Sequence, residues 1–217
     1  MRKDFKNLRE EEENITKAYN FSSNKYADYF KDELDEKTLD KELLNRFSKD
    51  INYGKVLDIG CGPGHISNYL FKIGCNVQGV DISKGMINVA NKLFKGIKFN
   101  IGDMFAIDER DNYFDGVCSF YSIVNFSYEN LDKVIKEYKR ILKNNGLLFI
   151  AFHVGNEKLT ADNFLDSNIS LDFYMHDLDK IVDLLKNNNF EISEAIIRYP
   201  YKSEHGTRRA YIIAKIE

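Results

Sequence analysis

The chain has 217 residues, which is long enough for one sizeable hydrophobic core, and a single α/β domain is the economical reading. Its 31 Lys and Arg against 34 Asp and Glu give a net charge of -3, so the chain lacks the positive field that usually attracts nucleic acid. It has no run of 18 apolar residues, no signal-peptide pattern and only three cysteines without C-x-x-C spacing, which argues against a membrane span, a disulfide framework and a zinc site and favours a reducing cytoplasm.

The first part of the chain predicts helices at residues 13–30 and 37–47, both with aromatic side chains, as a helical cover over residues 1–50. From residue 55 on, short β-type runs alternate with amphipathic segments. The predicted strands are residues 55–59, 76–80, 97–101, 114–120, 146–152, 190–197 and 208–216, and the helices between them are 65–73, 83–94, 129–143 and 176–188. Asn130 and Asp177 are predicted helix caps, and Gly146 a helix stop.

This order predicts an α/β fold with a Rossmann-like, seven-stranded, mostly parallel sheet, helices on both faces and an antiparallel last strand. We expect a single domain over residues 1–217. Residues 153–175 are too many for an ordinary connection and are expected to form a lid insertion with a short strand near residues 168–175. Ligands bind beyond the carboxyl ends of such strands, which favours this insertion as part of a site over a plain surface excursion.

Three glycines, Gly60, Gly62 and Gly64, separate the first strand from the first helix behind Asp58. Glycine lets a tight turn bring backbone N–H groups close to a ligand without intervening Cβ atoms. A dinucleotide fingerprint G-x-G-x-x-G would need its third glycine at His65 or Ser67, so the spacing does not fit a nicotinamide cofactor. A turn that uses glycine only for its shape is the structural alternative.

The motif D-x-G-x-G-x-G at residues 58–64 resembles that of class I S-adenosylmethionine (SAM) dependent methyltransferases. The resemblance continues over residues 55–152, through GVDIS with Asp81, NIGDMF with Asp103, and FDGVCSFYS. It implies that Asp81 bonds the ribose hydroxyls and Asp103 the adenine amino group, that Met104 offers its N–H, and that Met86 packs on the base. Asp58, within the turn, would orient it or reach the amino group of SAM through water, and a strand-end carboxylate that caps backbone N–H groups is the alternative. The implied cofactor-binding residues are Tyr19, Asp58, Gly60, Cys61, Gly62, Gly64, Asp81, Ile82, Met86, Gly102, Asp103, Met104 and Phe120.

The N-terminal segment AYNFSSNKYADYF resembles an aromatic segment that many small-molecule members lay over the cofactor. It implies that Tyr19 lies in the pocket with Tyr26 as a neighbour. Aromatic side chains at helical spacing are more often core residues, and that alternative stays open.

Methyl transfer is an in-line displacement, so a general base is needed only when the acceptor arrives protonated and weakly nucleophilic. His153, directly after the fifth strand, is the predicted base, and a histidine that bonds the lid backbone is the alternative. The string FHVGNE resembles a small-molecule subgroup and adds Glu157 as a substrate-binding candidate. Tyr121 and Asn125, after the fourth strand, are expected near the transferred methyl group, although an asparagine cannot serve as a base.

The C-terminal segment RYPYKSEHGTRRAYIIAKI resembles the same subgroup. Arg198 and Arg208 are predicted to bind the acceptor, and a solvated sheet edge is the alternative. Adjacent strand residues point to opposite faces, so at most one of Arg208 and Arg209 faces a given pocket.

The sequence therefore predicts a methyltransferase that moves a methyl group from SAM to a small-molecule acceptor and releases S-adenosylhomocysteine. A non-catalytic SAM-binding module and, less favoured, a nicotinamide-dependent oxidoreductase are the alternatives. The Asn-Pro-Pro-aromatic signature of enzymes that methylate nucleic-acid bases is absent, which with the acidic balance of the chain leads us to expect no nucleic-acid partner. The cysteine spacing indicates no zinc site, and no metal is expected. The sequence sets neither the acceptor nor the oligomeric state.

Overall fold

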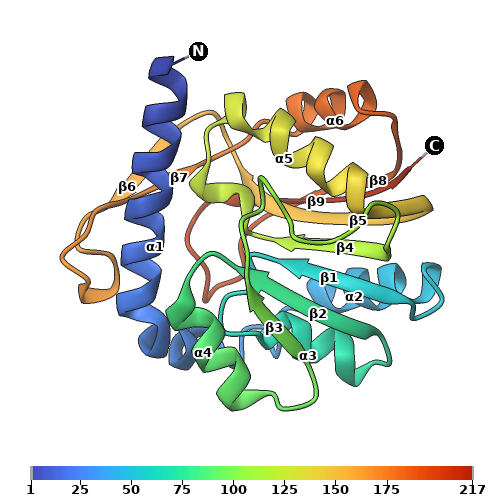
Figure 1. Ribbon diagram of the computed structural model, residues 1–217, viewed down its shortest axis with the longest axis horizontal. Coiled ribbons are helices and arrows are strands. Elements are labelled where there is room, and N and C mark those ends of the chain that lie inside the picture. Colours follow the sequence, from blue (N-terminus) through green and yellow to red (C-terminus); the bar gives the residue numbers. More distant parts are fainter. Residues whose placement is uncertain (1, 217) are drawn as a thin grey trace.

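The computed structural model describes the backbone of residues 2–216 and the side chains of residues 10–216. Helices and strands alternate along most of the chain (Figure 1). In chain order they are α1 (Arg2–Phe30), α2 (Thr38–Asp50), β1 (Lys55–Ile59), α3 (His65–Lys72), β2 (Asn76–Asp81), α4 (Lys84–Leu93), β3 (Lys98–Ile101), β4 (Phe114–Phe120), the 3-10 helix η1 (Ile123–Asn125), α5 (Tyr128–Ile141), β5 (Leu142–Val154), β6 (Lys158–Ala161), the 3-10 helix η2 (Phe164–Asp166), β7 (Leu171–Tyr174), α6 (Leu178–Asn187), β8 (Phe190–Arg198) and β9 (Arg208–Ile216).

The main sheet has seven strands in the order β3-β2-β1-β4-β5-β9-β8. Strands β1 to β5 pair in parallel, and β9 lies antiparallel between β5 and β8. The predicted Rossmann-like sheet with an antiparallel last strand is therefore confirmed. The chain order reverses between β1 and β4, and ligands of open α/β sheets bind beyond the strand ends at such a point.

The sheet is buried on both faces, and β5 shows how the sequence achieves this. Leu148, Ile150 and Phe152 join the core on the side of α5 and α6, whereas Leu147, Phe149 and Ala151 join the core on the side of α2, α3 and α4. Because successive strand residues alternate between faces, a strand covered on both sides reads as a continuous apolar run.

Of the three residues predicted to start or end a helix, Asn130 and Gly146 were wrong and Asp177 was right. Asn130 lies inside α5, which is preceded by Ser127, and Gly146 lies within β5, because the chain passes directly from α5 into that strand at Leu142. The partner of β4 jumps from Leu142 to Leu147, so the glycine belongs to an irregularity of the ladder. Asp177 caps α6 as predicted, since its Oδ1 accepts the N–H groups of Asp179 and Lys180.

Helix α1 and a hairpin made of β6 and β7 stand side by side at one end of the sheet (Figure 1). The hairpin lies within the 153–175 insertion; its strand β7 was expected and β6 was not. Asn20 fastens α1 to the start of α4, because its Oδ1 accepts the Gly85 N–H at 2.7 Å and the Ser83 hydroxyl at 2.9 Å. A Cβ at Gly85 would lie 2.6 Å from the Asn20 carbonyl oxygen, so this contact requires glycine. None of the helices in the described part of the chain has the length and apolar character needed to cross a membrane.

Candidate functional site

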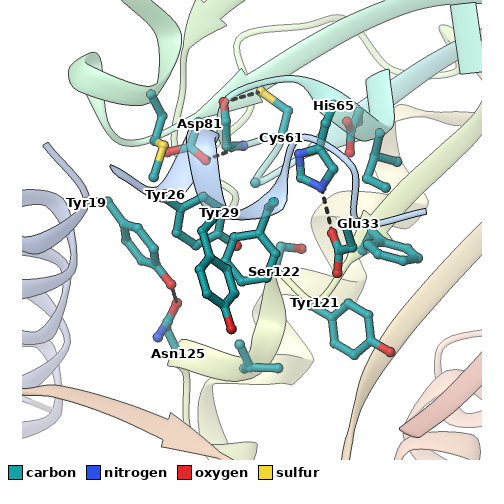
Figure 2. Close-up of a pocket in the computed structure, with 18 of the residues that line it drawn as sticks. Tyr19, Tyr26, Tyr29, Glu33, Cys61, His65, Asp81, Tyr121, Ser122 and Asn125 are labelled. Atoms are coloured by element: carbon teal, nitrogen blue, oxygen red, sulfur yellow. Dashed lines mark hydrogen bonds and ion pairs between the residues drawn. The ribbon is translucent and has the colours of Figure 1, made fainter. Parts of the chain in front are cut away.

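A cavity of about 740 Å³ lies between helix α1 and the ends of strands β1, β2, β4 and β5. Its walls also include η2 and β7 of the hairpin and the loop between β8 and β9. Figure 2 shows Tyr19 and Asn125 on one side of it, Asp81 and Cys61 on another, and Glu33 with His65 opposite Tyr19. The cavity thus joins the predicted glycine turn to segments from both ends of the chain.

The three glycines of the turn have positive φ angles, a backbone conformation that other residues rarely adopt. Gly60, Gly62 and Gly64 have φ values of +67°, +52° and +88°. A Cβ at Gly60 would lie 2.4 Å from Cβ of Ser122, whereas at Gly62 the nearest atom is 3.9 Å away, on the Tyr26 ring. Gly62 therefore leaves its backbone open to the cavity. Gly64, also predicted to bind the cofactor, does not line the cavity: it precedes α3 and packs against Phe99.

Asp81 ends β2 and lines the cavity beside the glycine turn. Its Oδ2 accepts the Gly62 N–H at 2.9 Å and its Oδ1 the Ser83 N–H at 2.8 Å. Burial raises the pKa of Asp81 to about 6, and these two bonds oppose that rise. The carboxylate is therefore ordered by backbone groups alone, with one further lone pair on each oxygen.

Asp58 lies at the other side of the turn and is 1% exposed. The Ser67 hydroxyl donates to its Oδ2 at 2.5 Å, which ties β1 to the first turn of α3. Burial raises the pKa of Asp58 to about 6, and this bond lowers it in part. These contacts support the predicted role of Asp58 in orienting the turn.

The end of β3 supplies the next part of the wall. Asp103 Oδ1 accepts the Phe105 N–H at 2.8 Å, which shapes the loop that carries it. Met86, in the first turn of α4, is 1% exposed. Apart from Gly64, the structure brings the predicted cofactor residues together around this one cavity. Its lining includes Tyr19, Asp58, Gly60, Cys61, Gly62, Asp81, Ile82, Met86, Gly102, Asp103, Met104 and Phe120.

Tyr19 reaches from α1 across the cavity to Asn125. Its hydroxyl donates to Asn125 Oδ1 at 3.0 Å, and Asn125 Nδ2 donates to the Asp172 carbonyl at 3.1 Å (Figure 2). The Tyr19 ring also meets the Tyr26 and Phe164 rings edge on. Helix α1, the loop after β4 and the hairpin are thus joined over the cavity, and both predicted residues line it.

The opposite side of the cavity carries Glu33, Lys37, His65, Glu204 and Arg209, which we call the charged end. Glu33 lies 2.7 Å from His65 Nε2 and 2.5 Å from Lys37 Nζ, and Lys37 Nζ lies 3.0 Å from Glu204. Burial alone would raise the pKa of Glu33, but the His65 ring and the Lys37 ammonium hold it at about 2. Sequence reasoning named Arg209 as one of two arginines that could face a pocket, but it missed Glu33, Lys37 and His65. The only signal for these three was the place of His65 directly after the glycine turn.

Arg198 is buried behind the charged end and does not line the cavity. Its guanidinium pairs with both oxygens of Glu204 at 2.6 and 2.9 Å, with Asp40 at 3.1 Å and with the Tyr211 hydroxyl at 2.9 Å. These bonds tie α2 to the last hairpin. Arg198 was predicted to bind the acceptor, but here its guanidinium is held by the protein's own side chains and has no place in the cavity wall.

Two further residues predicted to bind the acceptor, Arg208 and Glu157, do not line the cavity. Arg208 is exposed and lies away from the cavity, whereas Arg209 lines it, because neighbouring residues of β9 face opposite sides of the sheet. Glu157 is also exposed and bonds the N–H of Asn156 at 2.8 Å instead of facing the cavity.

His153 and Tyr121 line the cavity next to the charged end, with ring centroids 5.1 Å apart. His153 Nδ1 bonds Thr207 Oγ1 at 2.8 Å, which leaves Nε2 for a ligand. Burial, together with the positive charges of Arg209 and His205, lowers the pKa of His153 to about 3. The imidazole ring is therefore neutral at pH 7, and its low pKa makes it a weak base. Its role as a base stays a prediction. Among the described residues, no three His, Cys, Asp or Glu side chains lie close enough to hold a metal ion.

The chain is similar to known methyltransferases in sequence and in fold. Residues 57–150 match the family described as "Methyltransferase domain". A SAM-dependent methyltransferase from Methanosarcina mazei superposes with a TM-score of 0.68 at 20% identity, over 75% of this chain and 92% of that one, which shows a shared fold.

Two curated relatives are similar in sequence. Phosphoethanolamine N-methyltransferase of Plasmodium falciparum is 30% identical over 70% of this chain, and ubiquinone biosynthesis O-methyltransferase of Pelagibacter ubique is 28% identical over 64% of it. The matches cover 58% and 62% of those two proteins, so the chain spans about three fifths of their length.

Proposed function

We propose that the chain is a class I SAM-dependent methyltransferase, which transfers a methyl group from SAM to a small-molecule acceptor. One observation carries this proposal: the glycine turn, Asp81 and Asp103 come from the ends of three neighbouring strands and line one cavity. Their chain order and chemistry suit a ligand with an amino acid end, a ribose and an adenine.

Asp81 supports a ribose partner in particular. Each of its oxygens already accepts one backbone N–H, and a carboxylate oxygen has a second lone pair. Two acceptor positions are therefore left for two neighbouring hydroxyl groups. We assign the adenine to the wall made by Asp103, Met104 and Met86, and the amino acid end to the backbone around Gly60 and Gly62.

A small acceptor suits the enclosure of the cavity. Helix α1 and the hairpin lie over it, and Tyr19, Asn125 and Phe164 are joined by a hydrogen bond and a ring contact. The two curated relatives are named for phosphoethanolamine and for ubiquinone biosynthesis, which are small-molecule contexts. The net charge of -3 offers no support for a nucleic-acid partner. The three free cysteines Cys61, Cys75 and Cys118 support a reducing cytoplasm as the location.

Bound SAM supplies an electrophilic methyl group on a sulfonium. The residues of this chain have to align the acceptor with it and exclude water, because an in-line displacement gains most from orientation. The end of β4 and the loop after it, with Phe120 and Tyr121, lie between the glycine turn and the charged end, since Ser122 approaches Gly60 and Lys37 Nζ lies over the Tyr121 ring. We place the acceptor's reacting atom there, with the neutral His153 ring as the group that takes its proton when it carries one.

The first test separates cofactors by thermal shift. A ligand at a hundred times its dissociation constant stabilises a protein by about 2.7 kcal/mol, so S-adenosylhomocysteine should raise the melting temperature by several degrees and NAD should not. Stabilisation by NAD alone would overturn the proposal.

A second test separates an enzyme from a binding module. Incubation of a metabolite extract with the protein and methyl-labelled SAM should yield a product heavier by one methyl group. Tight S-adenosylhomocysteine binding without any methylated product from extracts of the source cells would favour the non-catalytic alternative.

A further inference from the structure

Two buried arginines lie at or behind the charged end, and they differ in how fully they are bonded. Arg198 is 9% exposed, and its Nε, Nη1 and Nη2 all donate to side chains. Arg209 is 4% exposed; its Nη1 donates to the carbonyls of His205 and Thr207, but its buried Nε has no hydrogen-bond partner. A buried donor without a partner costs free energy unless a ligand or water supplies an acceptor.

Glu204 cannot supply that acceptor. Its nearest oxygen lies 3.6 Å from Arg209 Nε, beyond hydrogen-bond range. Its Oε1 already accepts from Lys37 Nζ at 3.0 Å and Arg198 Nη2 at 2.9 Å. Its Oε2 accepts from Arg198 Nη1 at 2.6 Å and the Tyr201 N–H at 2.7 Å. Each carboxylate oxygen has two lone pairs, so Glu204 is saturated.

The position of Arg209 points to the cavity as the source of the missing acceptor. Arg209 lines the cavity and pairs with His153 across β5 and β9, whereas the fully bonded Arg198 does not line it. Its sequence neighbour Arg208 is exposed to solvent and does not line the cavity. Of these three arginines, only Arg209 borders the cavity, so a ligand bound there would lie against its side chain.

We propose that Arg209 binds an anionic group of the methyl acceptor, so that the acceptor is a small molecule bearing a carboxylate or a phosphate. This rests on the proposed methyl transfer. A guanidinium presents adjacent N–H groups that match two oxygens of either anion, and such charge-assisted pairs are stronger than neutral ones. Lys37 also lines the cavity, but its ammonium is already paired with Glu33 and Glu204, so Arg209 carries the recognition of the anion.

An anion at this position would also change His153. Arg209 is, after burial, the strongest cause of the lowered pKa of His153. A negative charge beside Arg209 offsets that cause and strengthens the ring as a proton acceptor. Binding of an anionic acceptor would then raise the basicity of His153, whereas binding of a neutral analogue would not.

The test is calorimetric titration of the protein saturated with S-adenosylhomocysteine, using benzoate, its neutral isostere benzamide, and inorganic phosphate. Benzoate or phosphate should bind the unmodified protein, and Arg209→Gln should weaken that binding about tenfold or more, the cost of losing a hydrogen bond between charged groups. Arg208→Gln is the matched control and should bind as the unmodified protein does. A preference for benzoate indicates a carboxylate acceptor, and a preference for phosphate a phosphorylated one.

Several results would overturn the proposal: no binding of either anion, equal binding of benzoate and benzamide, or equal losses in the two variants. If Arg209→Gln does not fold, Arg209→Lys and the benzoate-to-benzamide ratio of the unmodified protein decide instead. The titration is repeated without S-adenosylhomocysteine. Failure of that cofactor product to bind would count against the proposed function, while anion binding lost in Arg209→Gln would still support the site.

Discussion

The carboxylates at the two ends of the cavity have pKa values shifted in opposite directions. At the glycine turn, Asp58 and Asp81 bond a serine hydroxyl and backbone N–H groups, and burial raises the pKa of each to about 6. At the charged end, ion pairs overcome burial and hold the pKa of Glu33 and of Glu204 at about 2. The glycine-turn end keeps acceptor capacity for a ligand's donors, whereas the charged end uses its carboxylates to hold the protein's own cations.

This difference sets two opposite responses to pH. The lowered pKa of Glu33 and Glu204 stabilises the fold above about pH 4.5, and that contribution is lost as the pH falls toward 2. The raised pKa of Asp58 and Asp81 works the other way: their ionisation destabilises the folded protein as the pH rises from about 4 to 6. A ligand that donates to Asp81 would relieve part of that cost.

The largest expected effect is on the charged end. Glu204→Gln should lower the free energy of unfolding by about 3–5 kcal/mol, because it leaves the buried Arg198 and Lys37 without a shared partner. Urea unfolding at pH 7 measures this. The control is Glu13→Gln, whose pair with Lys17 is exposed and worth about 1 kcal/mol or less. Equal losses in both variants would remove the distinction between this buried network and a surface pair.

A smaller effect is expected at the glycine turn. Gly60→Ala should cost about 1–3 kcal/mol of unfolding free energy, because φ is +67° and the new Cβ would meet Ser122 at 2.4 Å. It should also weaken S-adenosylhomocysteine binding, since the turn would have to shift. Gly206→Ala is the control, as no atom lies within 4 Å of a Cβ there. Unchanged unfolding and binding in Gly60→Ala would show that the turn needs no glycine.

The smallest effect in free energy concerns Asp81. Asp81→Asn should weaken S-adenosylhomocysteine binding about tenfold with little change in fold, because one charged acceptor is lost. In the unmodified protein the affinity should fall as the pH drops below about 6, since protonation removes the carboxylate, and the variant should show a flatter profile. Calorimetry between pH 5 and 8 measures both. Asp28→Asn, on the exposed side of α1, should behave as the unmodified protein. A profile in Asp81→Asn as steep as before would assign the titration to Asp58 instead.

Much of the fold could be predicted because its signals are local. The apolar run of β5 indicated a strand buried on both faces, and Asp177 indicated a helix start. The helix stop at Gly146 was wrong, because the chain passes from helix to strand without a turn, and a glycine pattern alone does not report such a junction. Periodicity also predicted β7 but not its partner β6, whose four residues include only two apolar ones.

The sequence by itself determined the glycine-turn end, including the places of Asp58, Asp81 and Asp103. Each of these residues lies at or just after the end of a parallel strand, and parallel strands bring such residues to one edge whatever the rest of the chain does. Only the tertiary structure decided the charged end. Lys37, directly before α2, meets Glu204 from the loop between β8 and β9, and the face of β9 that points to the cavity depends on its register with β5. Alternation along a strand tells that Arg208 and Arg209 face opposite sides, but which side is the cavity follows from what packs there.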